Sequence, residues 1–146
     1  MKFNTHYSNK LLSKLIRLFS QGEYDHTSIE VNGYVYEAKI RVGVIKTPVK
    51  KWNSSTVVDS RTLKISPYRT KKVEQWLNEQ VGKKYDIFGV LSFVWVLFKE
   101  EKGRWLCSEL AYVALMKALN VKSDYNQRKS PHAFWYDLGV IIEIHD

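Results

Sequence analysis

A single cysteine, Cys107, stands where a charged loop gives way to an apolar helical pattern. The start of a helix presents unpaired backbone N–H groups, and the helix dipole favours a negative charge there. A cysteine at this position is therefore favoured as a thiolate, the form in which cysteine acts as a nucleophile. The same N–H groups can stabilise the oxyanion that forms when a carbonyl carbon is attacked.

A base for this nucleophile is offered by residues 26–38, whose pattern predicts a β-hairpin. Asn32-Gly33 is a strong signal for a two-residue turn, because both positions of such a turn need positive φ. The resulting register places His26 and Glu37 on one face as diagonal neighbours, about 7–8 Å apart between backbones. A carboxylate bonded to one imidazole nitrogen fixes the tautomer and stabilises the imidazolium.

Other interpretations of these residues stay open. A cysteine before an apolar helix is most often a small buried hydrophobe, and a histidine or glutamate on a hairpin is usually solvated. Asp25 and Asp86 could replace Glu37 as the carboxylate, although Asp25 is adjacent to His26 in a strand and should point the opposite way. The joint geometry favours a Cys-His-Glu site, with Glu37 on a solvated or cleft face.

The remaining histidines, His6, His132 and His145, show no metal-ligand spacing with Cys107, and zinc sites usually need tighter clusters. The sequence also has no glycine-rich loop for binding phosphate. We therefore expect neither a metal nor a cofactor.

The elements that must position the site follow from hydrophobic periodicity and turn signals. Helices are predicted over residues 9–19, 69–81, 87–98 and 107–119, and a short helix is predicted to open at Ser130-Pro131. Besides the hairpin, strands are predicted over residues 42–46, 62–65 and 140–144, with a polar loop over 51–59. Since strands cluster early and helices late, the expected fold is α+β, with a small antiparallel sheet packed against helices.

Composition bounds the class of protein. A chain of 146 residues fits one domain, and a single cysteine excludes an intramolecular disulfide. The longest apolar run, residues 87–98, is too short to span a bilayer, so we expect no integral membrane segment. No secretory signal is recognisable, which favours a cytoplasmic or phage-associated protein over one exported by the secretory route.

Positive charge is concentrated in one part of the sequence. The formal net charge is +8, and residues 41–84 hold 11 Lys/Arg against 3 Asp/Glu. A basic segment favours an anionic partner such as nucleic acid, an anionic membrane surface or a cell-wall polymer. The ordinary alternative is a solvated basic face.

Several motifs resemble those of one family. Cys107-Ser108-Glu109-Leu110, followed by an Ala/Val/Leu-rich helix, resembles the nucleophile helix of NlpC-type peptidases, papain-like cysteine enzymes that include many cell-wall hydrolases. Residues 82–89 are similar to the Gly-x-x-Tyr segment that precedes the family's cysteine, and the His26 hairpin resembles its histidine strand with a polar third residue. Because the histidine precedes the cysteine, the chain resembles the circularly permuted branch, which includes lecithin retinol acyltransferase-like proteins and small bacterial and phage proteins.

The resemblance implies a single papain-like domain over residues 1–146 in which Cys107 is the nucleophile, His26 the base and Glu37 the orienting residue. It also implies that Tyr85 lines the oxyanion site through its hydroxyl, with Ser108 beside it, although a core position for Tyr85 is equally open. The implied activity is hydrolysis of an amide bond, with a cell-wall (peptidoglycan) peptide as the first candidate substrate.

Two departures from the family bear on the alternatives. Glu109 stands where the family usually has a small residue, so it could narrow the cleft or pair with a basic group of the substrate. The acyltransferase branch favours a second histidine where this chain has Glu37, which leans away from retinoid-type acyl transfer. A lipid acyltransferase, thioesterase or lipase of the same fold stays an alternative, as does a non-catalytic basic module that binds an anionic polymer through residues 41–84.

Overall fold

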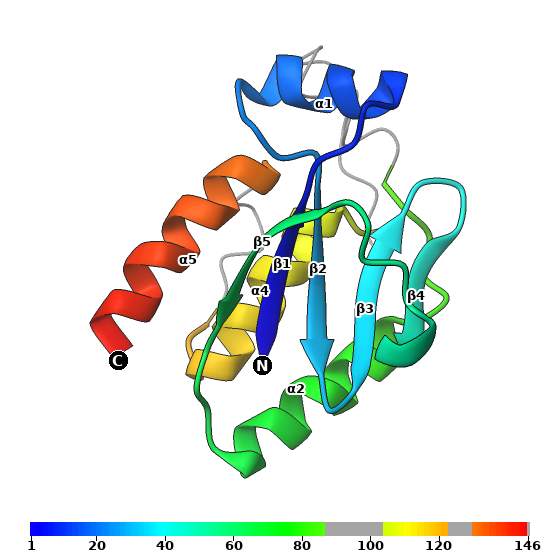
Figure 1. The fold of residues 1–146 in the computed structure, drawn as a ribbon. Helices are drawn as coiled ribbons and strands as arrows, with labels where there is room; N and C mark the ends of the chain where they lie inside the picture. Colours follow the sequence, from blue (N-terminus) through cyan, green and yellow to red (C-terminus); the bar gives the residue numbers. More distant parts are fainter. Residues whose placement is uncertain (87–103, 123–129, 146) are drawn as a thin grey trace.

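A five-stranded antiparallel sheet organises the computed structural model, which describes residues 1–86, 104–122 and 130–145 (Figure 1). The strands are β1 (Lys2–His6), β2 (His26–Val31), β3 (Tyr34–Lys39), β4 (Gly43–Pro48) and β5 (Val57–Thr62), in the order β4-β3-β2-β1-β5. The helices described are α1 (Leu11–Ser20), α2 (Pro67–Gln80), α4 (Cys107–Leu119) and α5 (Pro131–His145), together with a 3-10 turn, η1 (Val49–Lys51). The predicted α+β class is confirmed.

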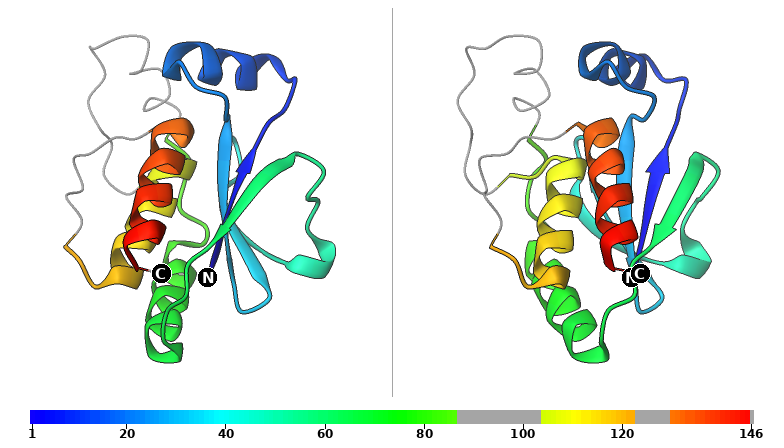
Figure 2. Two further views of the ribbon diagram at one scale, coloured as in Figure 1. Left: turned by 60° about the vertical axis from the view of Figure 1, so that its left-hand side comes forward. Right: turned by 90° about the vertical axis from the view of Figure 1, so that its left-hand side faces the viewer.

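The helices α2, α4 and α5 lie on one face of the sheet, and α1 lies across the end of the sheet where β2 begins (Figures 1 and 2). Phe3 of β1, Ile29 of β2 and Tyr36 of β3 pack with α4 in the hydrophobic core. Because side chains alternate along a strand, their sequence neighbours point to the other face. Asn4, Ser28 and Glu37 therefore lie on the other face, where Trp52, the residue after η1, contacts Glu37.

The predicted hairpin is confirmed. Asn32 and Gly33 have φ values of 47° and 78°, as a two-residue turn of this kind requires, and Val31 pairs with Tyr34 across it. This local turn sets the register of β2 against β3 and with it the geometry of the site.

The helix that carries the cysteine begins and ends where periodicity places it, at Cys107 and Leu119. The Glu109 Oε2 accepts a hydrogen bond from the Leu106 backbone N–H at 3.2 Å, which satisfies a donor at the helix start. Asn120, with φ of 59°, ends the helix in the left-handed conformation. The predicted position of Cys107 at a helix N-terminus is thus confirmed.

The bounds of two other helices differ slightly from the prediction. The sequence predicts helices over 9–19 and 69–81, and the structure has α1 at Leu11–Ser20 and α2 at Pro67–Gln80. The N-cap Ser66 starts α2 two residues early, because its hydroxyl accepts from the Arg69 N–H and Pro67 suits the first turn. The exposed side chains of α1 include Leu11 and Leu18. Among the described residues, no helix has the length and apolar character needed to cross a membrane.

The strand predicted over 62–65 is wrong. The strand is β5, which occupies Val57–Thr62 and pairs with β1, so part of the predicted polar loop is also strand. As an edge strand with mostly exposed side chains it lacks the apolar alternation that marks a half-buried strand. The predicted strand was placed too late in the sequence because it was centred on the apolar Leu63, a buried residue that follows β5.

The strand predicted over 140–144 is also wrong, because these residues form the second half of α5. Their β-branched side chains favour a strand as isolated residues. Phe134 and Leu138 are buried at helical spacing, and Ile141 and Ile142 pack against the same core, so tertiary burial outweighs local preference. The helix predicted over 87–98, and most of the loop predicted after it, lie outside the described residues.

Candidate active site

The hairpin brings the His26 imidazole and the Glu37 carboxylate into contact. The His26 Nε2 lies 3.0 Å from the Glu37 Oε2, and the His26 side chain is 22% exposed. The predicted diagonal neighbourhood of the two residues is confirmed. Because Glu37 occupies Nε2, Nδ1 is the ring nitrogen left for a second partner.

Glu37 is buried in the wall of a pocket, so of the predicted solvated or cleft face the structure shows the cleft. It is 2% exposed, and its Oε1 accepts from the Trp52 Nε1 at 3.2 Å and from the Lys39 Nζ at 2.8 Å. Burial works to raise the pKa of Glu37, but the hydrogen bonds from His26 and Lys39 outweigh it and lower the pKa to about 2. Glu37 is therefore an anchored anion at neutral pH.

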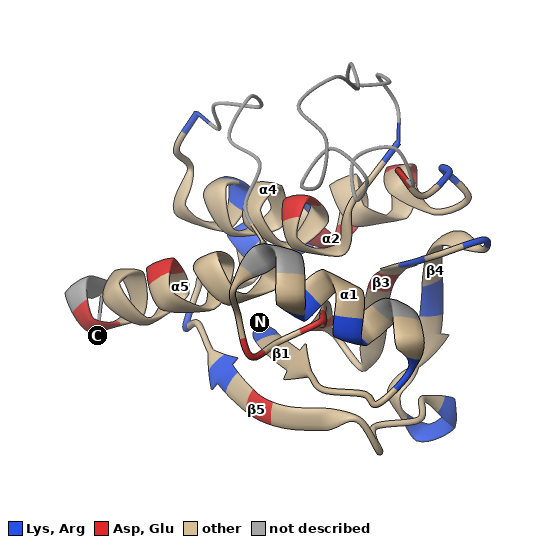
Figure 3. Cartoon of the chain, turned by 90° about the horizontal axis from the view of Figure 1, so that it is seen from above, with Lys and Arg blue, Asp and Glu red and all other residues tan. Residues whose placement is uncertain are grey.

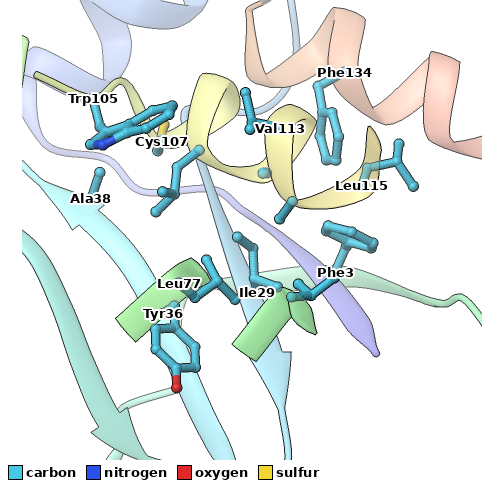
Figure 4. Close-up of a cluster of buried hydrophobic side chains, with 14 of the residues drawn as sticks. Phe3, Ile29, Tyr36, Ala38, Leu77, Trp105, Cys107, Val113, Leu115 and Phe134 are labelled. Atoms are coloured by element: carbon cyan, nitrogen blue, oxygen red, sulfur yellow. The ribbon is translucent and has the colours of Figure 1, made fainter. Parts of the chain in front are cut away.

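The second partner of His26 is Cys107, the first residue of α4. The Cys107 side chain forms a hydrogen bond with the His26 ring, and the residue is 4% exposed. Figure 4 shows it beside Trp105 at the N-terminal end of α4. Burial lowers the pKa of His26, but the interactions with Cys107 and with the Glu37 carboxylate outweigh burial and raise the pKa to about 10.

Tyr85 contacts the same sulfur. Tyr85 is 6% exposed and belongs to the core. Its backbone forms an isolated β-bridge with Trp105, and its hydroxyl forms a hydrogen bond with Cys107. Burial and the neighbouring Cys107 raise the pKa of Tyr85 well above its usual range. Tyr85 is at once a core aromatic and a hydroxyl donor at the cysteine, so the two interpretations left open by the sequence are compatible.

The residues that follow Cys107 belong to the first turn of α4. Ser108 is buried at 2% exposure, directly after the cysteine. The carboxylate of Glu109 hydrogen bonds to the backbone of its own helix start. This contact gives Glu109 a structural role that the sequence did not predict.

A pocket of about 410 Å³ opens onto the site. His26, Glu37 and Tyr85 line it, and α1 contributes Ser13 and Ile16 to its wall. A ligand in this pocket would therefore meet the base directly, with α1 beside it.

The two alternative carboxylates take other places. Asp25 pairs with Arg17 at 2.8 Å and accepts from the Ser8 backbone N–H at 2.7 Å, so it ties α1 to the sheet. Asp86 is buried next to Tyr85. The carboxylate that contacts His26 is that of Glu37.

A second histidine, His6, lies in the site and was missed by sequence reasoning. It pairs directly with His26 across β1 and β2, and the centroids of the two rings are 4.9 Å apart. His6 is 3% exposed as a residue and lines the pocket. A prediction of β1 as a strand could have placed His6 beside His26. The polar residues Asn4 and Thr5 gave this segment no clear strand pattern, so β1 was not predicted.

In the described part of the chain, no group of three or more His, Cys, Asp or Glu side chains is placed to hold a metal ion. His132 contacts the rings of Tyr24 and Tyr136 instead. The side chain of His145 lies outside the description.

The basic residues of segment 41–84 are distributed over several elements (Figure 3). Many have structural partners: Lys46 bonds to Asn78 at 2.9 Å, and the Arg61 guanidinium stacks 4.3 Å from the Trp135 ring. These basic residues therefore come from several elements, and some of them are held by contacts within the fold.

Neither the comparison with protein-family models nor the search of curated proteins finds a match to this chain.

Proposed function

We propose that the chain is a cysteine hydrolase with the circularly permuted, papain-like NlpC-type arrangement, and that it cleaves an amide bond in a cell-wall peptide. The observation that carries the proposal is the contact series from Cys107 through His26 to Glu37. It joins a nucleophile at a helix start, a charged imidazole and an orienting carboxylate.

In the first half of the reaction, the Cys107 thiolate attacks the amide carbonyl carbon and forms a C–S bond. The first-turn N–H groups of α4 and the Tyr85 hydroxyl are available to the developing oxyanion. The His26 imidazolium then donates its proton to the leaving nitrogen as the C–N bond breaks. A thioester on Cys107 and a free amine result.

In the second half, neutral His26 takes a proton from water, and the hydroxide oxygen bonds to the thioester carbon. The C–S bond breaks, which releases a carboxylic acid and restores the thiolate. Glu37 accepts a hydrogen bond from His26 throughout, so the ring keeps one orientation while its charge changes.

The described lining of the pocket carries polar groups together with apolar surface from residues such as Ile16, Ile40 and Val42. Hydroxyl, amide and ammonium groups come from Ser8, Lys10, Ser13, Lys39, Asn53, Ser55 and Thr56. A peptide offers N–H and C=O groups for the polar partners and side chains for the apolar ones. Cell-wall peptide is the member of this class that the family resemblance suggests.

Turnover of peptidoglycan fragments and of a fluorogenic ester tests the proposal. Cys107→Ser and His26→Ala should abolish amide cleavage, while His132→Ala, a histidine outside the pocket, should retain it. Because the chain has one cysteine, iodoacetamide labelling reports on Cys107 alone.

Other outcomes point elsewhere. Acyl transfer from the ester to an added amine or alcohol, without amide cleavage, would favour the acyltransferase alternative. Amide cleavage that survives in Cys107→Ser would exclude a cysteine hydrolase and return attention to the basic residues.

A further inference from the structure

A chain of hydrogen bonds, buried at Asn4, Ser28 and His6, runs across three strands on one face of the sheet. The Ser60 hydroxyl donates to the Asn4 Oδ1 at 2.8 Å, and the Asn4 Nδ2 donates to the Ser28 Oγ at 3.3 Å. The Ser28 Oγ lies 2.9 Å from the His6 Nε2, and the His6 Nδ1 lies 3.0 Å from the Thr56 Oγ1. Both ring nitrogens of His6 are therefore occupied by hydroxyl groups.

The partners of His6 can satisfy a neutral ring. Since Ser28 accepts from Asn4, its own hydrogen is available to the His6 Nε2, while an Nδ1–H can donate to Thr56. A second proton on Nε2 would leave the buried Ser28 hydrogen without this acceptor. The arrangement thus suits an imidazole with one proton.

The electrostatic surroundings agree with this assignment. His26 on β2 and Lys39 on β3 oppose a positive charge on His6, and Glu37 on β3 favours one. Burial and then the His26 charge lower the pKa of His6 to about 3. Of the two adjacent rings, His26 carries the charge and His6 stays neutral.

We propose that His6 is a positioning residue, whose neutral ring, fixed between Ser28 and Thr56, supports the His26 imidazole in the orientation that faces Cys107. This proposal rests on the proposed function. His26 is the first residue of its strand, and Glu37 holds only one of its atoms. The His6 ring, itself packed edge-on against Trp52 with centroids 5.7 Å apart, supplies lateral support without charge repulsion.

Two substitutions distinguish the contribution of the His6 ring from that of its hydrogen bonds. His6→Ala removes the ring and the hydrogen bonds together. We expect kcat for amide cleavage to fall about 10–100-fold in this variant with little change in KM, because a misplaced base slows the chemical step. His6→Phe keeps a ring against His26, and should bring kcat back to within about 10-fold of wild type. His132→Ala is the matched control. Equal loss in both His6 variants, or wild-type kcat in His6→Ala, would overturn the proposal.

Imidazole NMR on the unaltered protein decides the matter even where a variant does not fold. Ring-proton contacts between His6 and His26, with His6 singly protonated across about pH 5 to 8, are expected. Absence of those contacts, or titration of His6 in that range, would overturn the proposal. Loss of catalysis in Cys107→Ser and His26→Ala with normal catalysis in His6→Ala would reject this proposal alone, whereas catalysis that survives in Cys107→Ser rejects the proposed function.

Discussion

Glu37 receives hydrogen bonds from three donors that come from different parts of the chain: His26, Lys39 and Trp52. A carboxylate with two occupied oxygens has little freedom to turn. The direction of the His26 Nε2 is therefore fixed by a side chain that is itself fixed, which is what a pre-organised base requires.

Replacing Glu37 with Gln tests this arrangement. The amide keeps the volume of the side chain but turns one acceptor into a donor that faces another donor, so we expect a loss of about 1–3 kcal/mol in the free energy of unfolding. Turnover should fall by about 10²- to 10⁴-fold, because an amide cannot stabilise the imidazolium. Urea unfolding and amide-cleavage assays give the two numbers. Unchanged turnover would remove Glu37 from the mechanism.

The charge on His26 can be tested through the reactivity of Cys107. With a pKa of about 10, His26 stays positively charged at neutral pH beside Cys107. Iodoacetamide labelling of the wild type should therefore be fast at pH 7. In His26→Ala the half-maximal rate should move toward the value of a free thiol, about pH 8.5. Coincident pH profiles would show that His26 does not activate the thiol.

Within the site, local patterns predicted what lies close in the sequence. The contact between His26 and Glu37 follows from a two-residue turn, and the place of Cys107 follows from helical periodicity. The contacts of Trp52 and His6 depend on strands that pair over long separations, and no local pattern encodes such pairings.

At the scale of elements, the junction between α1 and the sheet depends on the buried pair of Arg17 and Asp25. Asp25→Asn removes the charge that balances Arg17, and should cost about 2–4 kcal/mol of unfolding free energy. We also expect faster hydrogen exchange in α1, which forms part of the pocket wall. Glu23→Gln, at an exposed position nearby, should change stability by less than about 0.5 kcal/mol. Equal effects of the two changes would show that the pair does not hold α1.

Elements with a strong local signal were predicted, and those stabilised by their surroundings were not. The turn at Asn32-Gly33 and the apolar face of α4 can each be recognised from the local sequence, without knowledge of the rest of the fold. The strand β1 is largely polar yet lies inside the sheet, and Val140 lies in a helix because α5 buries its neighbours. Packing against distant residues decides both cases.

For the whole molecule, two lowered pKa values predict sensitivity to acid. His6 changes from an ordinary pKa of 6.5 to about 3 on folding, and Glu37 from 4.5 to about 2. In both cases the unfolded chain binds the proton first, so stability is present above the ordinary value and is lost as pH falls through the folded value.

The contribution of His6 can be isolated. Wild-type stability should fall by on the order of 1 kcal/mol per pH unit between pH 6.5 and pH 3 from this residue alone. His6→Phe should flatten that part of the profile, and His132→Phe should not. Urea midpoints measured at intervals across this range provide the comparison, and parallel profiles in wild type and His6→Phe would contradict the assignment.

The place of β1 between β2 and β5 also has a consequence for synthesis on the ribosome. β1 emerges early and can pair with β2, but its other edge stays open until residues 57–62 have left the exit tunnel. An open edge presents a row of unpaired N–H and C=O groups to other chains. We expect a nascent chain arrested with β4 but not β5 outside the tunnel to aggregate more readily than one arrested with β5 outside, because β5 then covers the exposed edge of β1.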